Sequence, residues 1–197
     1  MTKTGYFNTE SGLPTIVGEV KNTGTSSIKN VYIQGLFLCK DGNVINNDKT
    51  YPAIVYGYAE IEVLEPGDVS PFKIVMPSNF PDFAYILTQL AKFNANVEDF
   101  TVTTVAPYKD YQFTNVSGSL LVVNKHYNLT GVITNTGSTP LSDIKIVGTF
   151  YTPDKPIAVE SVHVYSLDPG EQAYFTIMVE DNDVAPLITR YDLKGSP

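Results

Sequence analysis

One stretch of this sequence occurs twice. Residues 18–24, Gly-Glu-Val-Lys-Asn-Thr-Gly, recur 113 residues later as residues 131–137, Gly-Val-Ile-Thr-Asn-Thr-Gly, and the match continues without a gap to Phe37 and Phe150. Residues 64–67, Leu-Glu-Pro-Gly, then recur as residues 167–170, Leu-Asp-Pro-Gly, at a spacing of 103. A shared order of motifs is typical of repeated structural units. It predicts two tandem domains, residues 1–100 and 101–197, with ten additional residues in the first.

Both copies alternate apolar and polar residues with a period of two. Ile16, Gly18 and Val20 fall on one face of a predicted strand, and Glu19 and Lys21 fall on the other. Short strands of this kind, separated by turn signals, are typical of β-sandwiches. The fold class predicted is all-β, with two tandem immunoglobulin-like antiparallel β-sandwiches. Residues 81–90 predict at most a turn or two of helix, and residues 98–110 are read as an interdomain link or as the first strand of the second domain.

The connections carry their own signals. Each Asn-Thr-Gly segment places an Asn and a Gly, which tolerate the left-handed conformation, where the chain has to reverse. Pro66-Gly67 and Pro169-Gly170 suit the central positions of a type II turn, where the second residue needs a positive φ. Gly131, Gly35 and its counterpart Gly148 lie on inward faces, where glycine marks a bulge or a close approach.

The order of these features resembles the FxLYD-type domain, an immunoglobulin-like β-sandwich of archaeal and bacterial surface or secreted proteins, and more loosely the CARDB-like modules. The resemblance rests on residues 17–24, 28–31, 37, 64–67 and 71–74 and on their counterparts in the second copy. The Phe-x-Leu-Tyr-Asp segment itself is replaced by Gly-Leu-Phe-Leu-Cys at residues 35–39. The family implies a sandwich fold and no catalytic residues.

Charge and composition exclude several partners and cross-links. The chain has 13 Lys and Arg against 21 Asp and Glu, a net charge of −8. Nucleic acids and anionic membranes attract positive patches, so neither is expected as a partner. A single Cys permits no internal disulfide. No apolar run approaches the roughly 20 residues that span a bilayer, and the polar start is not a signal peptide.

Reactive side chains show no catalytic pattern. The sequence contains no Gly-x-Ser-x-Gly elbow, phosphate-binding loop or dinucleotide fingerprint. Cys39 falls on the inward phase of its strand, which predicts a small buried core residue. His126 and His163 have no second His or Cys at metal-ligand spacing and are interpreted as strand residues facing solvent. We therefore expect a protein that is not an enzyme.

Two acidic loops contain hard oxygen ligands of the kind that calcium prefers. Glu180, Asp181 and Asp183 follow the last strong strand pattern and are the candidate calcium ligands. Calcium is therefore the candidate cofactor, and a solvated acidic loop is the alternative. A second set lies in the insertion of the first copy: Asp41, Asn43, Asn46, Asn47 and Asp48.

The insertion of the first copy also contains a candidate binding patch. Residues 55–63 are read as one strand, whose outward set is Tyr56, Tyr58, Glu60 and Glu62. Tyrosine is enriched at recognition surfaces. The alternative is ordinary β-propensity, with each Tyr covering a sheet face or the partner domain.

Asn115 and Asn128 each begin an Asn-x-Ser/Thr triplet and are candidate glycosylation sites. We expect a non-enzymatic extracytoplasmic spacer or protein-interaction module, at the cell surface or secreted, with a protein or glycan as partner. The alternative is a carbohydrate- or peptide-binding module that uses the Tyr-bearing strand. Because neither a signal nor an anchor is found, we expect the sequence to be the ectodomain part of a longer surface protein.

Overall fold

A computed structural model describes residues 2–8, 11–46 and 52–196. The fold is all-β, as predicted, and its sheets are antiparallel. The strands of the first half are β1 (Thr2–Asn8), β2 (Leu13–Lys21), β3 (Ile28–Leu38), β4 (Ile54–Tyr58), β5 (Val63–Leu64), β6 (Val69–Val75) and β7 (Lys92–Val102). The strands of the second half are β8 (Tyr111–Leu120), β9 (Tyr127–Asn135), β10 (Leu141–Tyr151), β11 (Pro156–Leu167), β12 (Gln172–Val179) and β13 (Arg190–Ser196).

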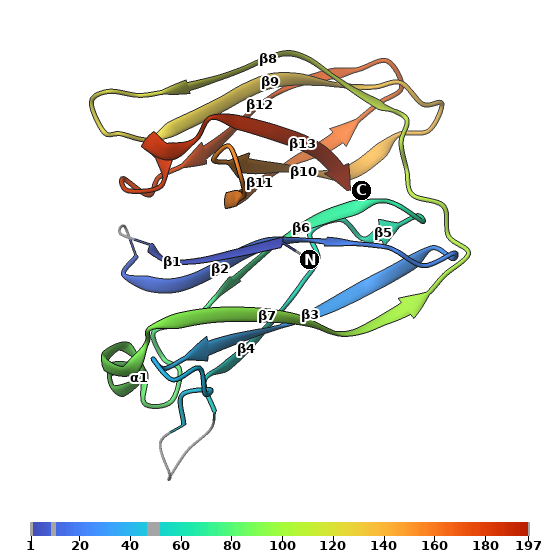
Figure 1. The fold of residues 1–197 in the computed structure, drawn as a ribbon. Helices are drawn as coiled ribbons and strands as arrows, with labels where there is room; N and C mark the ends of the chain where they lie inside the picture. The colour runs from blue at the N-terminus through green and yellow to red at the C-terminus, as the bar shows by residue number, and fades with distance from the viewer. Residues whose placement is uncertain (1, 9–10, 47–51, 197) are drawn as a thin grey trace.

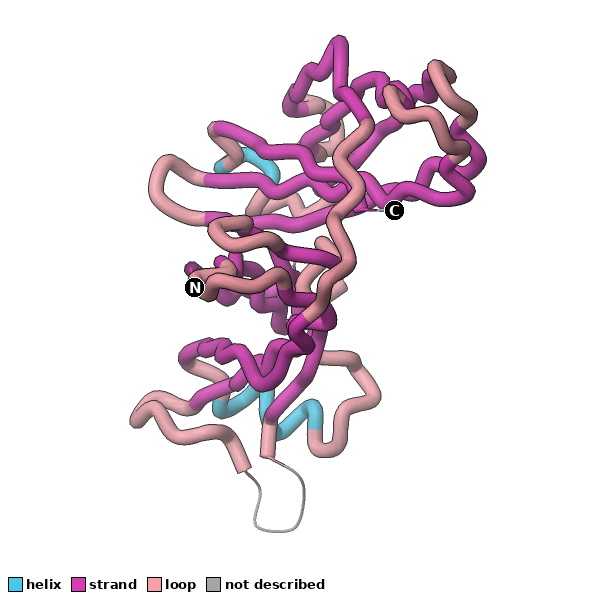
Figure 2. Tube along the Cα trace, turned by 90° about the vertical axis from the view of Figure 1, so that its right-hand side faces the viewer, coloured by secondary structure: helices cyan, strands magenta, loops and turns pink. Residues whose placement is uncertain are grey.

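Four sheets are stacked as layers (Figures 1 and 2). In the first half, a β1-β2-β6 sheet faces a sheet in which β3 pairs with β4, β5 and β7. In the second half, a β11-β10-β13 sheet faces a β12-β9-β8 sheet. The sheet of β2 lies against the sheet of β10 in the middle of the stack, and the connection between β7 and β8 runs along one side (Figure 1). We call the two halves the first and the second sandwich.

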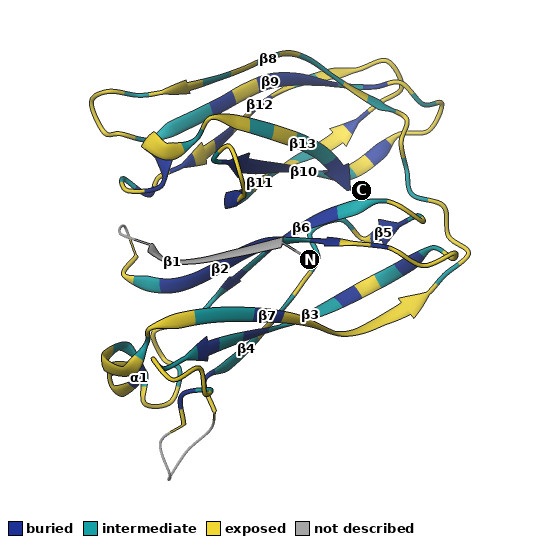
Figure 3. Cartoon of the chain, viewed as in Figure 1, coloured by how far each residue is buried: buried dark blue, intermediate teal, exposed yellow. Residues whose placement is uncertain are grey.

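Each sandwich encloses its own core, which Figure 3 shows as dark blue segments along the strands. Phe37 and Phe72 are fully buried in the first core, and Phe150 is fully buried in the second. The pairing registers agree as well, because Phe37 lies opposite Phe93 just as Phe150 lies opposite Tyr191. Alternation of buried and half-buried residues along β3 follows the predicted period of two.

The two Pro-Gly turns adopt the predicted conformation. Gly67 has a φ of 93° and Gly170 a φ of 78°. In both turns the amide of the residue after glycine donates to the carbonyl three residues earlier. The distances are 3.0 Å from Asp68 to Glu65 and 2.9 Å from Glu171 to Asp168. A positive φ at the second central residue is the requirement of a type II turn that glycine meets without steric cost.

The Asn-Thr-Gly segments are held differently from the prediction. Neither Asn22 nor Asn135 has a positive φ, and neither do Gly24 and Gly137. Instead, the Nδ2 of each Asn donates to two backbone carbonyls at 2.9 Å, and its Oδ1 accepts an amide two residues later at 3.0 Å. The motif therefore acts through a buried side chain that ties three segments together.

Close approach at the inward glycines is confirmed. A Cβ on Gly131 would lie 2.6 Å from Cζ of Phe175, its neighbour across the β9–β12 pair. A Cβ on Gly35 would lie 3.0 Å from Cγ2 of Ile74 and 3.2 Å from the carbonyl oxygen of Val55. At Gly131 an aromatic ring, not backbone, occupies the space that a side chain would need.

Two local predictions need correction. Residues 98–102 form neither a link nor a strand of the second sandwich, because they continue β7, and residues 103–110 make the connection. Cys39 is half-buried just after β3, where its Sγ donates to Oδ1 of Asp41 at 2.7 Å. The hydrogen bond to the Asp41 carboxylate, together with burial, raises the pKa of the Cys39 thiol.

The short helix is α1 (Phe83–Gln89), within the predicted range, and one 3₁₀ turn, η1 (Ala185–Leu187), precedes β13.

Candidate functional site

The segment between β4 and β5 positions the site. The predicted continuous strand over residues 55–63 is wrong, because β4 ends at Tyr58 and the chain then turns toward the other sheet of the sandwich. Ala59 forms a bridge with Phe72, and the amide of Glu60 donates to the carbonyl of Pro71 at 2.8 Å. Residues 59–62 therefore reach the surface where the two sandwiches meet.

Charged side chains connect the two sandwiches at this surface. Lys145 on β10 forms an ion pair with Glu60, whose side chain is only 18% exposed. Lys73 on β6 pairs with Glu160 on β11 at 2.6 Å. Glu60 is thus an interface residue, and not a member of an outward-facing patch as the sequence predicted. Partly buried pairs between rigid strands are screened by solvent less than pairs on an open surface.

An apolar cluster lies between these ion pairs. Val17 on β2 packs against Val147 on β10 and Val159 on β11, and all three are at most 2% exposed. Ile61, from the segment after β4, packs against the same cluster. Two sheets from different sandwiches therefore share a small dry contact that fixes their relative position.

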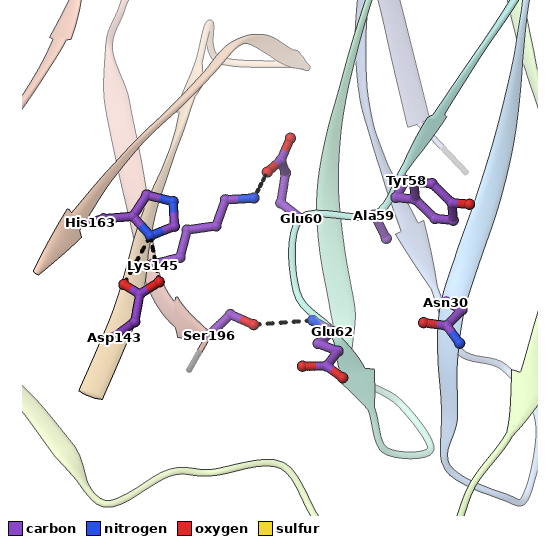
Figure 4. Close-up of a pocket in the computed structure, with 9 residues that line it drawn as sticks. All are labelled: Asn30, Tyr58, Ala59, Glu60, Glu62, Asp143, Lys145, His163 and Ser196. Carbon is purple, nitrogen blue, oxygen red and sulfur yellow. Dashed lines mark hydrogen bonds and ion pairs between the residues drawn. The ribbon is translucent and has the colours of Figure 1, made fainter. Parts of the chain in front are cut away.

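A pocket of about 290 Å³ opens at the edge of this contact (Figure 4). Figure 4 shows the residues of both sandwiches that line it: Asn30, Tyr58, Ala59, Glu60, Glu62, Asp143, Lys145, His163 and Ser196. Three of the four residues predicted from the insertion, Tyr58, Glu60 and Glu62, line it. The sequence could not predict the pocket residues that the second sandwich contributes, because they lie more than 80 positions after Glu62 along the chain.

The polar groups of the pocket are largely engaged with one another. Nδ1 of His163 lies 2.9 and 3.1 Å from the two carboxylate oxygens of Asp143, and its ring stacks on Tyr165. Oγ of Ser196 accepts a hydrogen bond from the amide of Glu62 at 3.2 Å. No hydrogen bond joins His163 to Ser196 among the described residues, so the geometry required of a base beside a nucleophile is not met here.

Three tyrosines lie side by side on the outer face of the β3–β4 pair. The ring of Tyr32 stacks on Tyr56 at a centroid distance of 5.0 Å and 8° between planes, and it lies 4.9 Å from Tyr58. Tyr56 and Tyr58 are 45% and 60% exposed. Tyr32 was missed by the sequence reasoning, although it occupies the outward phase of β3 and pairs directly with Tyr58. We call these three residues the tyrosine face.

Amides border the tyrosine face. Gln34 is opposite Tyr56 in the β3–β4 pair and opposite Asn96 in the β3–β7 pair, and its Nε2 donates to the hydroxyl of Tyr56 at 3.3 Å. Partial burial raises the pKa of Tyr32, and its neighbours Tyr58, Tyr56 and the Glu98 carboxylate act in the same direction. The face is therefore aromatic at its centre, with amides and a carboxylate around it.

The acidic loop predicted to bind calcium is organised by its own backbone. Asp181 is 2% exposed, and its Oδ1 accepts the amides of Asp183 and Val184 at 2.9 and 3.1 Å. Its carbonyl accepts the amide of Ala185 at 2.8 Å, so Asp181 begins the turn that contains η1. Glu180 and Asp183 are exposed. In the described ranges no three His, Cys, Asp or Glu side chains are grouped so that they could hold a metal ion.

In the second acidic set, Asp41 is engaged locally. Its Oδ2 accepts a hydrogen bond from Nδ2 of Asn43 at 2.9 Å, and its Oδ1 accepts the amide of Asn43 at 3.1 Å. Asn46 is exposed. Asn47 and Asp48 lie outside the described residues.

The two candidate glycosylation residues differ in accessibility. Asn115 is exposed at an irregularity of the β8–β9 pairing and has a φ of 52°. Asn128 lies in β9, between β8 and β12, and its Oδ1 is buried. His126 is half-buried, with its Nδ1 2.9 Å from Nδ2 of Asn124, and it does not approach the pocket. Asn115 is thus the accessible one of the pair.

Comparisons with known proteins give little guidance. No family model matches the chain, so the resemblance to FxLYD-type domains stays a prediction. No curated protein matches it either. Among solved structures, the exo-chitosanase CsxA of Amycolatopsis orientalis is similar at 16% identity and a TM-score of 0.25, over 87% of this chain and 21% of that one. Its D469A variant, in complex with PNP-β-D-glucosamine, is similar at 13% identity and a TM-score of 0.26, over 93% and 25%. The chain thus spans about a quarter or less of these structures, and likeness at such TM-scores carries no argument about function.

In the part of the chain that the structure describes, no helix has the length and apolar character required to cross a bilayer.

Proposed function

We propose that this chain is a non-enzymatic protein-interaction module whose tyrosine face, together with the adjoining pocket, binds a partner protein. The observation that carries the proposal is the continuity of the two features at Tyr58, which stacks beside Tyr32 and also lines the pocket. Tyrosines supply large contact areas at a low cost in side-chain entropy, which is why they are frequent in binding surfaces.

The charges of the pocket favour a basic group from the partner. Glu62 is exposed, and Asp143 is only partly shielded by its contact with His163. Lys145, the single lysine that lines the pocket, is paired with Glu60. A lysine or arginine of the partner would meet carboxylates there and an aromatic ring beside them, the two environments that stabilise a cation.

The contact between the sandwiches supports a rigid presentation of this surface. Residues from both sandwiches line the pocket, so its shape depends on the ion pairs and the apolar cluster at the contact. A preformed surface avoids part of the ordering cost of binding. This agrees with the expected role as a spacer or interaction module outside the cytoplasm, and with the resemblance to FxLYD-type domains, both of which remain proposals.

A second candidate function is glycan binding at the same face. The observation in its favour is the row of amides, Gln34, Asn94 and Asn96, on the outer side of β3 and β7, since Ala95 between the last two points into the core. Amide groups both donate and accept hydrogen bonds, which suits hydroxyl-rich ligands.

The experiment is a selection of phage-displayed random peptides on the immobilised chain. We expect enrichment of sequences that combine Lys or Arg with an aromatic residue. Replacing Tyr56→Ala together with Tyr58→Ala should weaken the selected peptides at least about tenfold in biolayer interferometry, as expected for aromatic anchors of an interface. Glu62→Gln should weaken them less and lower their salt dependence.

The matched control is Tyr85→Ala together with Tyr174→Ala, which removes two exposed tyrosines that belong neither to the tyrosine face nor to the pocket lining. Peptides that bind the Tyr56/Tyr58 variant as tightly as the unmodified chain would contradict the proposal. A glycan array probed with the same variants tests the second candidate, which requires glycan binding that is lost in the Tyr56/Tyr58 variant and kept in the control.

A further inference from the structure

Corresponding edge strands of the two sandwiches differ in their protection. β6 ends one sheet of the first sandwich, and β12 ends one sheet of the second. The two strands occupy the same place in the repeat, because Phe72 and Phe175 are related by the spacing of 103. An unpaired strand edge is a template for pairing with another chain, and proteins protect such edges with proline, charged side chains or a covering segment.

β6 has all three kinds of protection. Pro71 has no N–H to donate, and its carbonyl accepts the amide of Glu60 at 2.8 Å. Ala59 forms a bridge with the strand as well, so the segment after β4 covers this edge. Lys73 adds a charge. β6 is thus closed to a further strand.

β12 has none of these. At the spacing of 103, Tyr174 replaces Pro71 and Thr176 replaces Lys73. Residues 172–179, Gln-Ala-Tyr-Phe-Thr-Ile-Met-Val, contain neither a charged residue nor a proline, and the structure describes no strand other than β9 beside them. β1 and β13, which contain the ends of the described chain, pair with β2 and β10 and not with β12.

The open side of β12 presents a regular row of backbone groups. The carbonyl of Glu171 accepts the amide of Asn135 at 3.1 Å, so it points toward β9. Backbone groups alternate between the two sides of a strand, and the register with β9 is regular, so every second residue from 172 onward directs its N–H and C=O away from β9. These residues are Gln172, Tyr174, Thr176 and Met178. On that side the described chain supplies them with no partner strand.

Acidic residues stand at both ends of this uncharged strand. Asp168 and Glu171 precede β12, Glu180 and Asp183 follow it, and all four are exposed. In either direction, a second copy paired with β12 would bring acidic residues against acidic residues, and like charges opposite each other destabilise a strand pair. A partner strand with basic residues at both ends would meet opposite charges instead. Charge complementarity therefore favours a partner over a second copy.

We propose that the open edge of β12 binds an extended, uncharged segment of a partner polypeptide with Lys or Arg at each end, which joins the β12-β9-β8 sheet as an antiparallel strand. Main-chain hydrogen bonds to β12 give the complex its affinity, and the charges at the ends give it specificity. The inference concerns the second sandwich and does not depend on the tyrosine face, which lies on the first.

The position of β12 also sets the pattern of the partner's side chains. Tyr174 and Thr176 are exposed on the outer face of the sheet, whereas Phe175 between them is buried. Partner residues bonded directly opposite Tyr174 and Thr176 point to the same outer face, so they are polar. The residues between them point toward β11, where Val162 and Val164 are half-buried against the second core. Small apolar side chains suit these positions.

The probe is the synthetic peptide Lys-Thr-Val-Thr-Val-Thr-Val-Thr-Lys with blocked ends, added to the ¹⁵N-labelled full chain in an NMR titration. Antiparallel pairing that places its last Lys opposite Glu171 brings its first Lys next to Glu180. We expect shifts of the amide signals of residues 172–180. The same peptide with Glu in place of both Lys should bind at least about tenfold more weakly.

Backbone methylation distinguishes strand addition from other contacts. In the proposed pairing, the Thr amides of the peptide donate to β12 and the Val amides point away from it. N-methylation of the Thr residues should therefore abolish binding, whereas N-methylation of the Val residues should leave most of it. Equal effects of the two modifications, or equal binding of the Lys and Glu peptides, would overturn the proposal.

Variants of β12 provide the second measurement. Tyr174→Pro and Thr176→Lys introduce the residues that protect β6, and each should weaken the peptide at least about tenfold. Tyr174→Ala keeps the backbone N–H and should weaken it less. The matched charge control is Val105→Lys, which changes a residue that is 54% exposed in the connection between β7 and β8.

The Tyr56→Ala/Tyr58→Ala variant should bind this peptide as the unmodified chain does, so failure of the proposed function and failure of this inference can be told apart. Undiminished binding to Thr176→Lys, or shifts outside β12, would contradict the inference. So would self-association without peptide that Thr176→Lys abolishes, because it would assign the edge to a second copy. Should Tyr174→Pro not fold, the methylated peptides decide on the unmodified chain.

Discussion

The hydroxyl of Tyr151, in the second sandwich, donates a hydrogen bond to Oε1 of Glu19, in the first, at 2.7 Å. Tyr151 is 4% exposed, and the guanidinium of Arg190 lies 3.6 Å from the centre of its ring. Burial and the Glu19 carboxylate raise the pKa of the Tyr151 hydroxyl. The hydroxyl therefore remains a donor throughout the neutral range and links strands from both sandwiches.

Replacing Tyr151→Phe should lower the free energy of unfolding by about 1–3 kcal/mol, because a hydrogen bond to a charged acceptor is lost in a partly buried place. Urea denaturation followed by circular dichroism measures the change. The control is Tyr174→Phe, whose side chain is 90% exposed and which should change stability by less than about 0.5 kcal/mol. Equal stabilities of the two variants would show that the Tyr151–Glu19 hydrogen bond adds nothing.

Asn135→Ala should cost about 2–4 kcal/mol of stability. The residue is fully buried, and its side chain bonds two carbonyls, one amide and the hydroxyl of Tyr108. Buried groups left without partners after such a replacement cost more than the average net hydrogen bond. Asn22→Ala should cost less, since Asn22 makes the same bonds without a tyrosine.

The control for the asparagine variants is Asn46→Ala, which removes an exposed amide. Thermal unfolding ranks the three proteins. From the highest melting temperature to the lowest, the expected order is Asn46→Ala, Asn22→Ala, Asn135→Ala. A melting temperature of Asn135→Ala near that of Asn46→Ala would refute the assigned role of the motif.

Gly131→Ala should destabilise the second sandwich by about 1–3 kcal/mol, the usual range for overfilling a packed core. The added methyl group would overlap with the ring of Phe175, whose Cζ lies 2.6 Å from its position. Phe175→Leu removes that ring atom. In a double-mutant cycle, the Gly131→Ala/Phe175→Leu protein should be more stable than the sum of the single changes predicts. If the two changes in the free energy of unfolding were strictly additive, the result would argue against a contact between residue 131 and the ring of Phe175.

The sequence was sufficient to predict those strands and turns that depend on local patterns alone. Alternation along β3 and the Pro-Gly turn at Gly67 follow from period and backbone chemistry alone. The interface position of Glu60 was not predictable in this way. It depends on Lys145, 85 residues further along the chain, and on the end of β4 at Tyr58. Period-two patterns show which way a residue points only as long as the strand continues.

In the candidate site, too, the sequence predicted local features but not the contacts between strands. Tyr56 and Tyr58 are exposed, as the alternation indicated, but the stacking of Tyr32 on Tyr56 requires the register of β3 against β4. No local motif specifies that register.

Glu160 gives the contact between the sandwiches a dependence on pH. Burial raises the pKa of its carboxyl above the usual value, and Lys73, at 2.6 Å, opposes this shift. The folded state therefore keeps the proton to a higher pH than the unfolded state does. Stability contributed by this group falls as the pH rises from about 4.5, the ordinary value, through the raised pKa.

The Glu160→Gln variant lacks this titration, so the stability of the unmodified chain relative to the variant should fall as the pH rises above about 4.5. Urea unfolding at half-unit steps of pH measures the difference. The control is Glu98→Gln, which removes an exposed carboxylate of the first sandwich. A stability difference between the unmodified chain and Glu160→Gln that increases with pH would mean that Lys73, and not burial, dominates at the contact, and the assigned direction of the pKa shift would be wrong.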